Sequence, residues 1–353
     1  MARVLMKGNE AIALAAVKGG CDAFFGYPIT PQNEIPEFLS KYMNEHGKVF
    51  VQAESEVAAI NMVYGAAGAG IRTMTSSSSP GIALKQEGIS YIAAAELPCV
   101  IVNVMRGGPG LGGIQPSQAD YKQITRGGGN GDYSVIAYAP ENLQETVDIM
   151  KESFDVADYY RNPVMIAVDG LIGQMMEPVD LDRPTPKRDL KEKTWATTGV
   201  STGPNRRIIT SIHLDPVELE KHVWKLYDKY QLIKENEQRY ELINMNDAEF
   251  VIVAYGSMSR ICRSSIELLA EEGIKVGMIR PITIWPYPKK AFDQIPSTVK
   301  GILCAELSTG QMLDDVLIAN NGRHKVKFFG RTGGMIPDPE EIVEAIKKYR
   351  KEV

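Results

Sequence analysis

The sequence predicts an α/β protein built from two doubly wound units. Short, almost wholly apolar runs alternate with segments whose apolar residues recur at helical spacing. Strands that are apolar on both sides are typical of a parallel sheet covered by helices on both faces. The 353 residues suffice for two domains. We expect a doubly wound domain over residues 1–178, a connector with a long helix over 179–247 and a second α/β domain over 248–353.

In the first domain, predicted strands and helices alternate. The clearest helix covers residues 141–160, where Leu143, Val147 and Phe154 recur at helical spacing with acidic residues between them. We expect strands at 21–27, 49–53, 72–77, 98–105, 134–139 and 163–169, and helices at 9–19, 32–44, 56–69, 81–94 and 141–160. This order is typical of a doubly wound parallel sheet.

The chain changes character after the first domain. Its segment "PVDLDRPTPKRDLKEKTW" is rich in proline and charge, and residues 215–244 have the pattern of one long solvated helix. The strand and helix alternation resumes in "EFVIVAYGSMSR", "KVGMIRP", "KGILCAEL" and "KVKFFGR". The last helix should begin after Asp338 as N-cap, with Pro339 in its first turn and Glu341 completing a capping box.

Composition excludes several classes of protein. The formal net charge of -5 and the absence of dense Lys and Arg runs argue against nucleic acid as a partner. The N-terminus lacks the apolar core of a signal peptide, and no run approaches 18 apolar residues, so we expect a cytoplasmic protein that does not enter membranes. The four cysteines and four histidines are scattered, without the spacing of a metal or iron–sulfur site, and the cysteines are expected to be buried thiols.

Loops that follow strands are the candidate sites, because ligands of open parallel sheets bind beyond the carboxyl ends of the strands. The first such loop reads "YPITPQNE". Its prolines, Pro28 and Pro31, restrict the backbone between Tyr27 and the next helix and so direct the side chains of Ile29 and Thr30. A rigid strand-to-helix turn with no ligand is an equally good interpretation.

Two further loops carry polar groups next to helix starts. Glu56 opens a helix of small apolar residues; it either complements the helix dipole or is a buried carboxylate that shares a proton with a ligand nitrogen. In "TSSSSPG", the hydroxyls of Ser77, Ser78 and Ser79 either line a pocket or cap the helix, and Gly81 permits close backbone approach.

A fourth loop follows the most apolar strand. Arg106 leaves that strand directly into "GGPGLGGIQPSQAD", where its guanidinium could bind a substrate carboxylate or pair with a structural acid. The glycine-rich segments lack the GxGxxG spacing, and no GxxxxGK[ST] occurs, so nicotinamide and ATP enzymes are poorly supported.

Taken in order, these loops resemble those of one enzyme family, the α-type subunits of 2-oxoacid:ferredoxin oxidoreductases, over nearly the whole chain. The amino-acid sequences of these motifs are most similar to those of the 2-oxoisovalerate, or branched-chain, members of the family. The motifs that carry the resemblance are "YPITPQNE", "QAESEVAAINM", "SSSSPGIALKQEGISYIA", "RGGPGLGGIQPSQAD", "VAYGSMSR", "IRPITIWPYP", "AELSTGQM" and "GRTGGMIPDPEE".

The resemblance implies a pyrimidine-type thiamine diphosphate domain followed by a transketolase C-terminal-like domain. Glu56 matches the family's catalytic glutamate, which hydrogen-bonds the aminopyrimidine ring nitrogen and favours the imino tautomer. Thr30 and Arg106 match residues that bind the carboxylate and carbonyl of the 2-oxo acid, and both also border the cofactor. Pro28 matches a residue packed near the cofactor.

The resemblance also implies partners. A β-type subunit would hold the diphosphate tail and Mg²⁺, since this chain has no GDG motif with a distal Asn, and [4Fe-4S] clusters would lie on other subunits, which include γ-type and ferredoxin-like chains. The implied reaction is oxidative decarboxylation of a branched-chain 2-oxo acid to acyl-CoA and carbon dioxide, with coenzyme A and ferredoxin as co-substrates.

Three alternatives remain open at the level of sequence. The substrate could be 2-oxoglutarate or another 2-oxo acid, although the small apolar loop "GLGGIQPSQ" favours an aliphatic side chain over a second carboxylate. The chain could be a non-catalytic scaffold subunit. It could also be a self-sufficient thiamine enzyme that binds Mg²⁺ and the cofactor alone.

Overall fold

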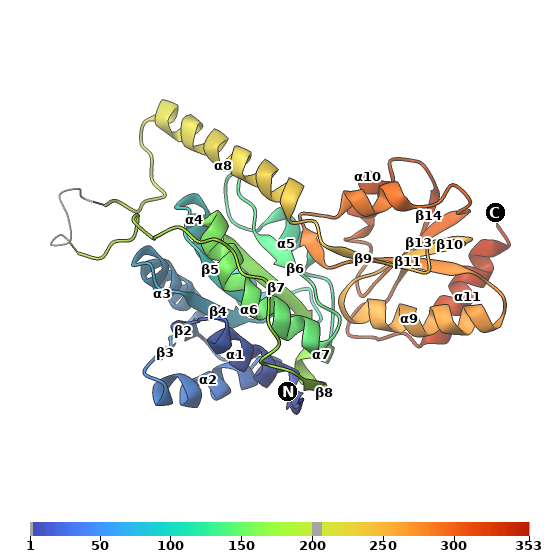
Figure 1. Ribbon diagram of the computed structural model, residues 1–353, viewed down its shortest axis with the longest axis horizontal. Coiled ribbons are helices and arrows are strands. Elements are labelled where there is room, and N and C mark those ends of the chain that lie inside the picture. Colours follow the sequence, from blue (N-terminus) through green and yellow to red (C-terminus); the bar gives the residue numbers. More distant parts are fainter. Residues whose placement is uncertain (1–2, 200–206, 353) are drawn as a thin grey trace.

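The computed structural model describes residues 3–199 and 207–352. Two α/β units lie side by side, with the N-terminus on the larger unit and the C-terminus on the smaller one (Figure 1). The predicted fold class is confirmed. None of the helices in the described ranges is long and apolar enough to cross a membrane.

The larger unit contains a seven-stranded sheet. Its strand order is β12-β6-β7-β5-β4-β2-β3, and every neighbouring pair is parallel except β12 with β6. The strands are β12 (Thr283–Trp285), β6 (Ile136–Tyr138), β7 (Pro163–Asp169), β5 (Cys99–Met105), β4 (Thr73–Ser77), β2 (Ala23–Gly26) and β3 (Val49–Gln52). Every residue of β5 and β7 is buried, as expected for central strands covered on both faces.

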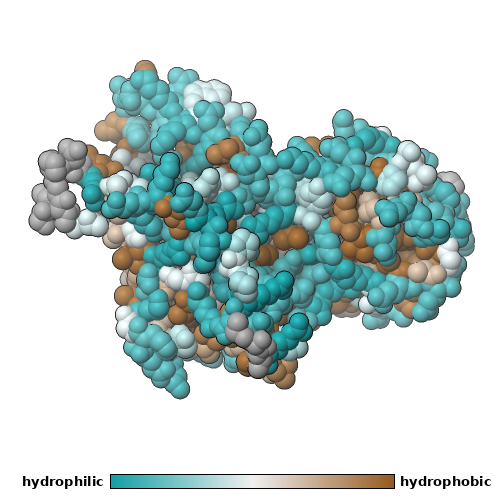
Figure 2. All heavy atoms as spheres, in the orientation of Figure 1, coloured by the Kyte–Doolittle hydropathy of each residue, from teal (hydrophilic) through white to brown (hydrophobic). Residues whose placement is uncertain are grey.

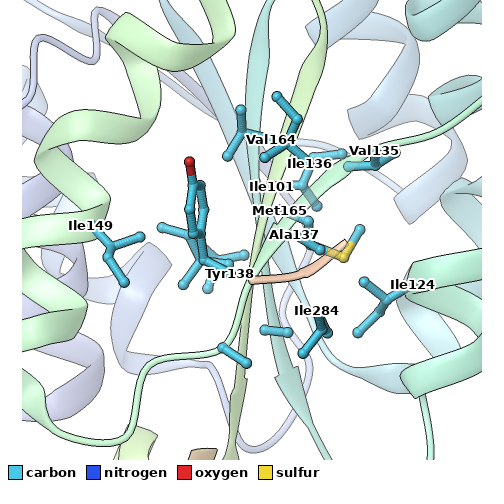
Figure 3. Close-up of a cluster of buried hydrophobic side chains, with 14 of the residues drawn as sticks. Ile101, Ile124, Val135, Ile136, Ala137, Tyr138, Ile149, Val164, Met165 and Ile284 are labelled. Carbon is cyan, nitrogen blue, oxygen red and sulfur yellow. The ribbon is translucent and has the colours of Figure 1, made fainter. Parts of the chain in front are cut away.

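Two groups of helices cover this sheet. One group packs around α1, which contacts α2 and α6, and in the other α3 packs on α4. The helices are α1 (Gly8–Lys18), α2 (Glu34–Glu45), α3 (Glu56–Gly68), α4 (Ser79–Ala94), α5 (Tyr121–Arg126), α6 (Leu143–Tyr160) and α7 (Gly170–Gln174). Figure 3 shows the core beside β6, where Ile149 of α6 and Ile284 of β12 flank Ile136, Ala137 and Tyr138.

The smaller unit has a five-stranded sheet in the order β14-β13-β10-β11-β9, in which only the β11–β9 pair is antiparallel. The strands are β14 (Lys325–Gly330), β13 (Gly301–Glu306), β10 (Phe250–Val253), β11 (Val276–Pro281) and β9 (Tyr240–Ile243). Helices α9 (Gly256–Glu271), α10 (Leu313–Asn320) and α11 (Pro339–Arg350) and the 3₁₀ segment η2 (Lys289–Gln294) follow these strands. The predicted capping box at Asp338 and Glu341 is confirmed.

The long helix α8 (Pro216–Asn236) ends earlier than predicted. The prediction of a helix to residue 244 is wrong, because Tyr240–Ile243 form β9 against β11. At Glu237, where the helix ends, the buried carboxylate accepts hydrogen bonds from Tyr160 and Arg188 and so holds the chain against the larger unit. The charged residues after Asn236 continue the helical pattern, so the sequence does not show where the helix ends.

Two further features were not predicted. The short strands β1 (Val4–Lys7) and β8 (Met176–Val179) form an antiparallel pair. Strand β12 comes from the chain of the second unit but extends the first sheet. In the view of Figure 2, the surface is mainly hydrophilic over both units, with smaller apolar patches between the polar side chains.

Candidate active site

The site is built where β2, β4 and β5 end, at one edge of the parallel sheet. Thr30 and Arg106 lie in the segments that follow β2 and β5, and the serines from Ser77 to Ser79 connect the end of β4 to the start of α4. Glu56 joins them from the start of α3, which follows the neighbouring strand β3. These are carboxyl ends of parallel strands, the position at which doubly wound sheets bind ligands.

Hydrogen bonds from neighbouring side chains hold the backbone of the Thr30 loop, while several of the loop's own side chains are exposed. The side-chain amides of Asn9 and Gln174 donate to the carbonyl of Pro31 at 2.7 and 3.0 Å. Gln32 is fully buried, accepts from Ser76 Oγ at 2.5 Å and donates to the carbonyl of Tyr27 at 3.3 Å. The side chains of Asn9, Gln32 and Gln174 therefore fix the backbone, whereas Tyr27, Pro28 and Thr30 are exposed and Ile29 is half-buried.

Arg106 connects this loop to the glycine-rich loop. Its Nη1 donates to the Thr30 carbonyl at 2.9 Å and its Nη2 to the Leu111 carbonyl at 3.0 Å. The guanidinium is buried, its Nε has no hydrogen-bond partner, and within the described ranges it forms no ion pair. The structural-acid interpretation of Arg106 is thus not observed, and the cationic group keeps a donor for a ligand.

Glu56 occupies the first turn of α3. Ser55 caps the helix, its Oγ accepting from Ala58 N at 3.1 Å, so the helix does not need the Glu56 carboxylate as a cap. Glu56 is only 7% exposed, and no residue in the described part of the chain hydrogen-bonds or ion-pairs with its carboxylate. The Glu56 side chain is thus mostly covered by the protein while its carboxylate stays available to a ligand.

Gly81 brings Glu56 and Ser77 together. A Cβ atom added at Gly81 would lie 2.1 Å from Ser77 Oγ and 2.8 Å from Glu56 Oε1. Only glycine leaves room for both polar groups beside this turn of α4. The hydroxyls of Ser77 and Ser78 are buried without partners, and Ser78 at the N-cap makes no capping bond, so helix capping is not their role.

Ser79 joins this group to Arg106. Its Oγ accepts from the Arg106 backbone N–H at 3.0 Å and donates to Asp120 Oδ2 at 2.7 Å, and Asn103 Nδ2 also donates to Asp120 at 2.9 Å. Burial raises the pKa of the Asp120 carboxyl, while the bonds from Ser79 and Asn103 and the charge of Arg106 oppose that rise. Hydrogen bonds thus connect Asp120 through Ser79 to Arg106 and on to Thr30, while Glu56 and Ser77 both lie close to Gly81.

Sequence analysis did not single out Asp120, Asn103 or Lys85, which are buried polar residues around the site. Asp120 closes the motif "GGIQPSQAD", and this position was the only available signal. The four cysteines are buried free thiols, as predicted. Among residues 3–199 and 207–352, no cluster of three or more His, Cys, Asp or Glu side chains is arranged to hold a metal ion.

A cleft of about 450 Å³ lies beside Thr30 and separates it from the smaller unit. Its walls are mainly apolar and, within the described chain, include no Lys or Arg. They are formed by Thr30, Pro31, Asn33, Glu34, Ile114, Gln115, Pro116, Gly170, Leu171, Gln174 and Ile336.

Comparison with known families identifies this arrangement. Residues 14–241 match the family described as pyruvate flavodoxin/ferredoxin oxidoreductase, thiamine diphosphate-binding. Residues 248–342 match core domain II of pyruvate:ferredoxin oxidoreductase. The chain belongs to this oxidoreductase family. The family that the loop motifs predicted is therefore confirmed.

Individual relatives show which members of the family this chain resembles more. The chain is 46% identical to the ketoisovalerate oxidoreductase subunit VorB of Methanothermobacter marburgensis, covering 100% of this chain and 99% of the relative. It is 34% identical to the 2-oxoglutarate synthase subunit KorA of Methanocaldococcus jannaschii, covering 97% and 98%. The higher identity agrees with the branch predicted from the motifs.

Solved structures agree with the fold. A 2-oxoglutarate:ferredoxin oxidoreductase from Magnetococcus marinus, with 2-oxoglutarate, coenzyme A and succinyl-CoA bound, matches 98% of this chain and 65% of its own, with a TM-score of 0.87 and 27% identity. A split-gene transketolase matches 97% of both chains with a TM-score of 0.59 and 14% identity, a likeness of fold alone.

Proposed function

We propose that the chain is the α-type subunit of a thiamine diphosphate-dependent 2-oxoacid:ferredoxin oxidoreductase acting on branched-chain 2-oxo acids such as 2-oxoisovalerate. Its products are the acyl-CoA, carbon dioxide and reduced ferredoxin. The observation that carries the proposal is the Glu56 carboxylate, which lies on a buried residue beside Gly81 at the sheet edge and has no hydrogen-bond partner among the described residues. The full-length similarity to VorB subunits supports the substrate.

The residues fit the aminopyrimidine end of thiamine diphosphate. The aminopyrimidine ring needs a carboxylate to bind its ring nitrogen, and Glu56 offers one. It also needs space beside its face, which the turn at Gly81 provides. The unpartnered hydroxyls of Ser77 and Ser78 offer further polar contacts. When bound, thiamine diphosphate supplies the nucleophilic carbon and the electron sink for decarboxylation. The pyrophosphate tail, Mg²⁺ and [4Fe-4S] clusters are assigned to β-type, γ-type and ferredoxin-like partner subunits, as the resemblance implies.

This chain's residues have distinct tasks. Glu56 holds a proton shared with the ring nitrogen, in a buried position where hydrogen bonds to a carboxylate are strong. Arg106 and Thr30 bind the carboxylate and carbonyl of the 2-oxo acid. The guanidinium of Arg106 is already oriented by two carbonyls, and the Thr30 hydroxyl has only a 3.5 Å contact from Asn33, so its proton is free to donate. Pro28 packs against the cofactor from the exposed side of its loop.

The substrate class follows from the loops around Thr30. The cleft offers apolar walls and no cation in the described chain, so an aliphatic side chain suits it better than a second carboxylate. Leu111 and Ile114 of the glycine-rich loop are 81% and 55% exposed and add apolar surface near Arg106. An enzyme specific for 2-oxoglutarate would need a positive group there.

The test uses the complex reconstituted with its partner subunits and measures ferredoxin reduction. Glu56→Gln should lower kcat by about 10³-fold or more, since an amide cannot exchange the proton. Glu54→Gln is the matched control, because Glu54 is an exposed carboxylate two residues away. Full activity of Glu56→Gln would instead favour the scaffold alternative. A kcat/KM higher for 2-oxoglutarate than for 2-oxoisovalerate would contradict the substrate.

A further inference from the structure

Lys85 is a buried lysine that the proposed function does not use. It lies in α4, fully buried, and its ammonium donates to Thr75 Oγ1 at 2.6 Å and to the Ser76 carbonyl at 3.1 Å. Both partners are neutral, and Lys85 forms no ion pair with any residue that the structure describes. A buried cation with only neutral partners is costly, so its retention requires a reason.

The position of Lys85 relates it to Glu56. Lys85 follows Gly81 by four residues in α4, and residues four apart lie on the same face of a helix. Gly81 lies close to the Glu56 carboxylate, and Lys85 lies one helical turn after Gly81 in α4. Among the described residues, Glu56 is the charged group that acts on Lys85: burial lowers the pKa of Lys85 to about 7, and the Glu56 charge opposes this.

We propose that Lys85 is a positioning residue: its ammonium orients the Glu56 carboxylate across the contact between α3 and α4. Neither Lys85 nor Glu56 forms an ion pair with a residue that the structure describes. The two opposite charges lie on neighbouring helices, α4 and α3, and attract one another through a medium of low dielectric. The role rests on the proposed function, because it matters for catalysis only if Glu56 contacts the cofactor.

Lys85 also reaches the substrate loop. The Ser76 carbonyl accepts from Lys85, while the Ser76 hydroxyl donates to Gln32, which in turn donates to the Tyr27 carbonyl. The lysine therefore fixes the end of β4 from which both Ser77 and the Thr30 loop are held. Its removal should disturb the orientation of the site without removing any group that touches a ligand.

The first test needs no cofactor and measures urea unfolding of the full chain between pH 6 and 10.5. The folded pKa of Lys85 lies below that of an unfolded lysine, about 10.4, so the unfolded chain binds more protons between about pH 7 and 10.4. Lys85 therefore makes stability rise with pH in this window, and Lys85→Met should remove that component of the rise.

Glu56→Gln removes the charge that favours the ammonium, so the rise should begin about one pH unit lower. Glu54→Gln should leave the curve as in the parent chain. An unchanged curve for Glu56→Gln overturns the proposal. This comparison does not depend on whether Lys85→Met folds.

A second test separates positioning from packing in the assembled complex. Lys85→Met should shift the pH profile of kcat/KM and weaken thiamine diphosphate binding, measured by calorimetry at several pH values, while Lys85→Arg should restore part of both. An equal loss at every pH, with the cofactor affinity unchanged, would overturn the positioning role. If Glu56→Gln remains fully active while the unfolding coupling holds, the proposed function fails and the Lys85–Glu56 coupling stands.

Discussion

Replacing Gly81 with alanine tests the geometry of the site without altering any polar group. The new Cβ would lie 2.1 Å from Ser77 Oγ, 2.8 Å from Glu56 Oε1 and 3.1 Å from Glu56 Cγ, whereas ordinary contacts begin at 3.4 Å. The Ser77 hydroxyl must then move by more than about 1 Å and the carboxylate by about half that, because the backbone of α4 is held by its own hydrogen bonds.

The magnitude follows from that displacement. A misplacement of about 1 Å at a reacting group can cost about 10²-fold in rate, or about 2.7 kcal/mol of transition-state stabilisation. Stability should change less, because alanine gains up to about 1 kcal/mol of helix propensity while overpacking costs about 1–3 kcal/mol. We therefore expect Gly81→Ala to fold and to lose about 10²-fold in kcat/KM.

The assay measures kcat/KM for 2-oxoisovalerate in the complex, with urea unfolding of the same preparations. Gly65→Ala in α3 is the control, because an alanine there meets no described atom within 4 Å. The control should keep its activity and gain a little stability. A folded Gly81→Ala complex with activity within twofold of the parent would refute the reasoning that the carboxylate must stay against this turn.

Two other substitutions test separate parts of the structure. Arg106→Lys should lower kcat/KM by about 10–10²-fold, mainly through KM, because an ammonium lacks the planar fork in which Nη1 and Nη2 hold the Thr30 and Leu111 carbonyls while Nε stays available to a ligand. Steady-state kinetics measure this, and an unchanged KM would contradict it. Arg280→Met should cost about 3–5 kcal/mol in urea unfolding, because the buried guanidinium holds Glu145 with two bonds and Glu241 with a third. The exposed Lys122–Asp314 pair serves as the control. Lys122→Met should lower the free energy of unfolding by at most about 1 kcal/mol. Equal losses of stability in Arg280→Met and Lys122→Met would refute the role of burial.

The sequence was most informative where burial is strongest. Strands β5 and β7 were predictable because both of their faces are covered, so their apolar runs are unbroken. The strands β1, β8, β9 and β12 were missed because each depends on a neighbour that sequence cannot identify. Their pairing is tertiary rather than local. The domain boundaries stay a prediction.

The same distinction applies to the site. Thr30 and Arg106 were predicted from loop chemistry, and they are in contact through the Thr30 carbonyl. The roles of Asp120 and Lys85 were not predictable, because a single polar residue in an apolar segment has no local signal. Their partners, such as Ser79 for Asp120, come from distant parts of the chain. Only the folded arrangement relates these residues to the site.

The second unit takes part in the site through its own strand ends. Gln118, which follows the glycine-rich loop, donates to the Tyr255 carbonyl at 2.8 Å and accepts from the Leu307 backbone N–H at 2.8 Å. Tyr255 lies two residues after β10 and Leu307 directly follows β13, so the carboxyl edge of the second sheet faces the carboxyl edge of the first.

These contacts brace the chain on both sides of Asp120. Tyr121 donates to Asp315 at 2.6 Å, and the Ser257 hydroxyl bonds to Asp169 at the end of β7. Arg106 is connected to Asp120 through Ser79, so a shift of the second unit would move the segment that orients the guanidinium. The motifs "VAYGSMSR" and "AELSTGQM" therefore fix the loop that carries the Arg106 cation, and under the proposed function they would support substrate binding indirectly.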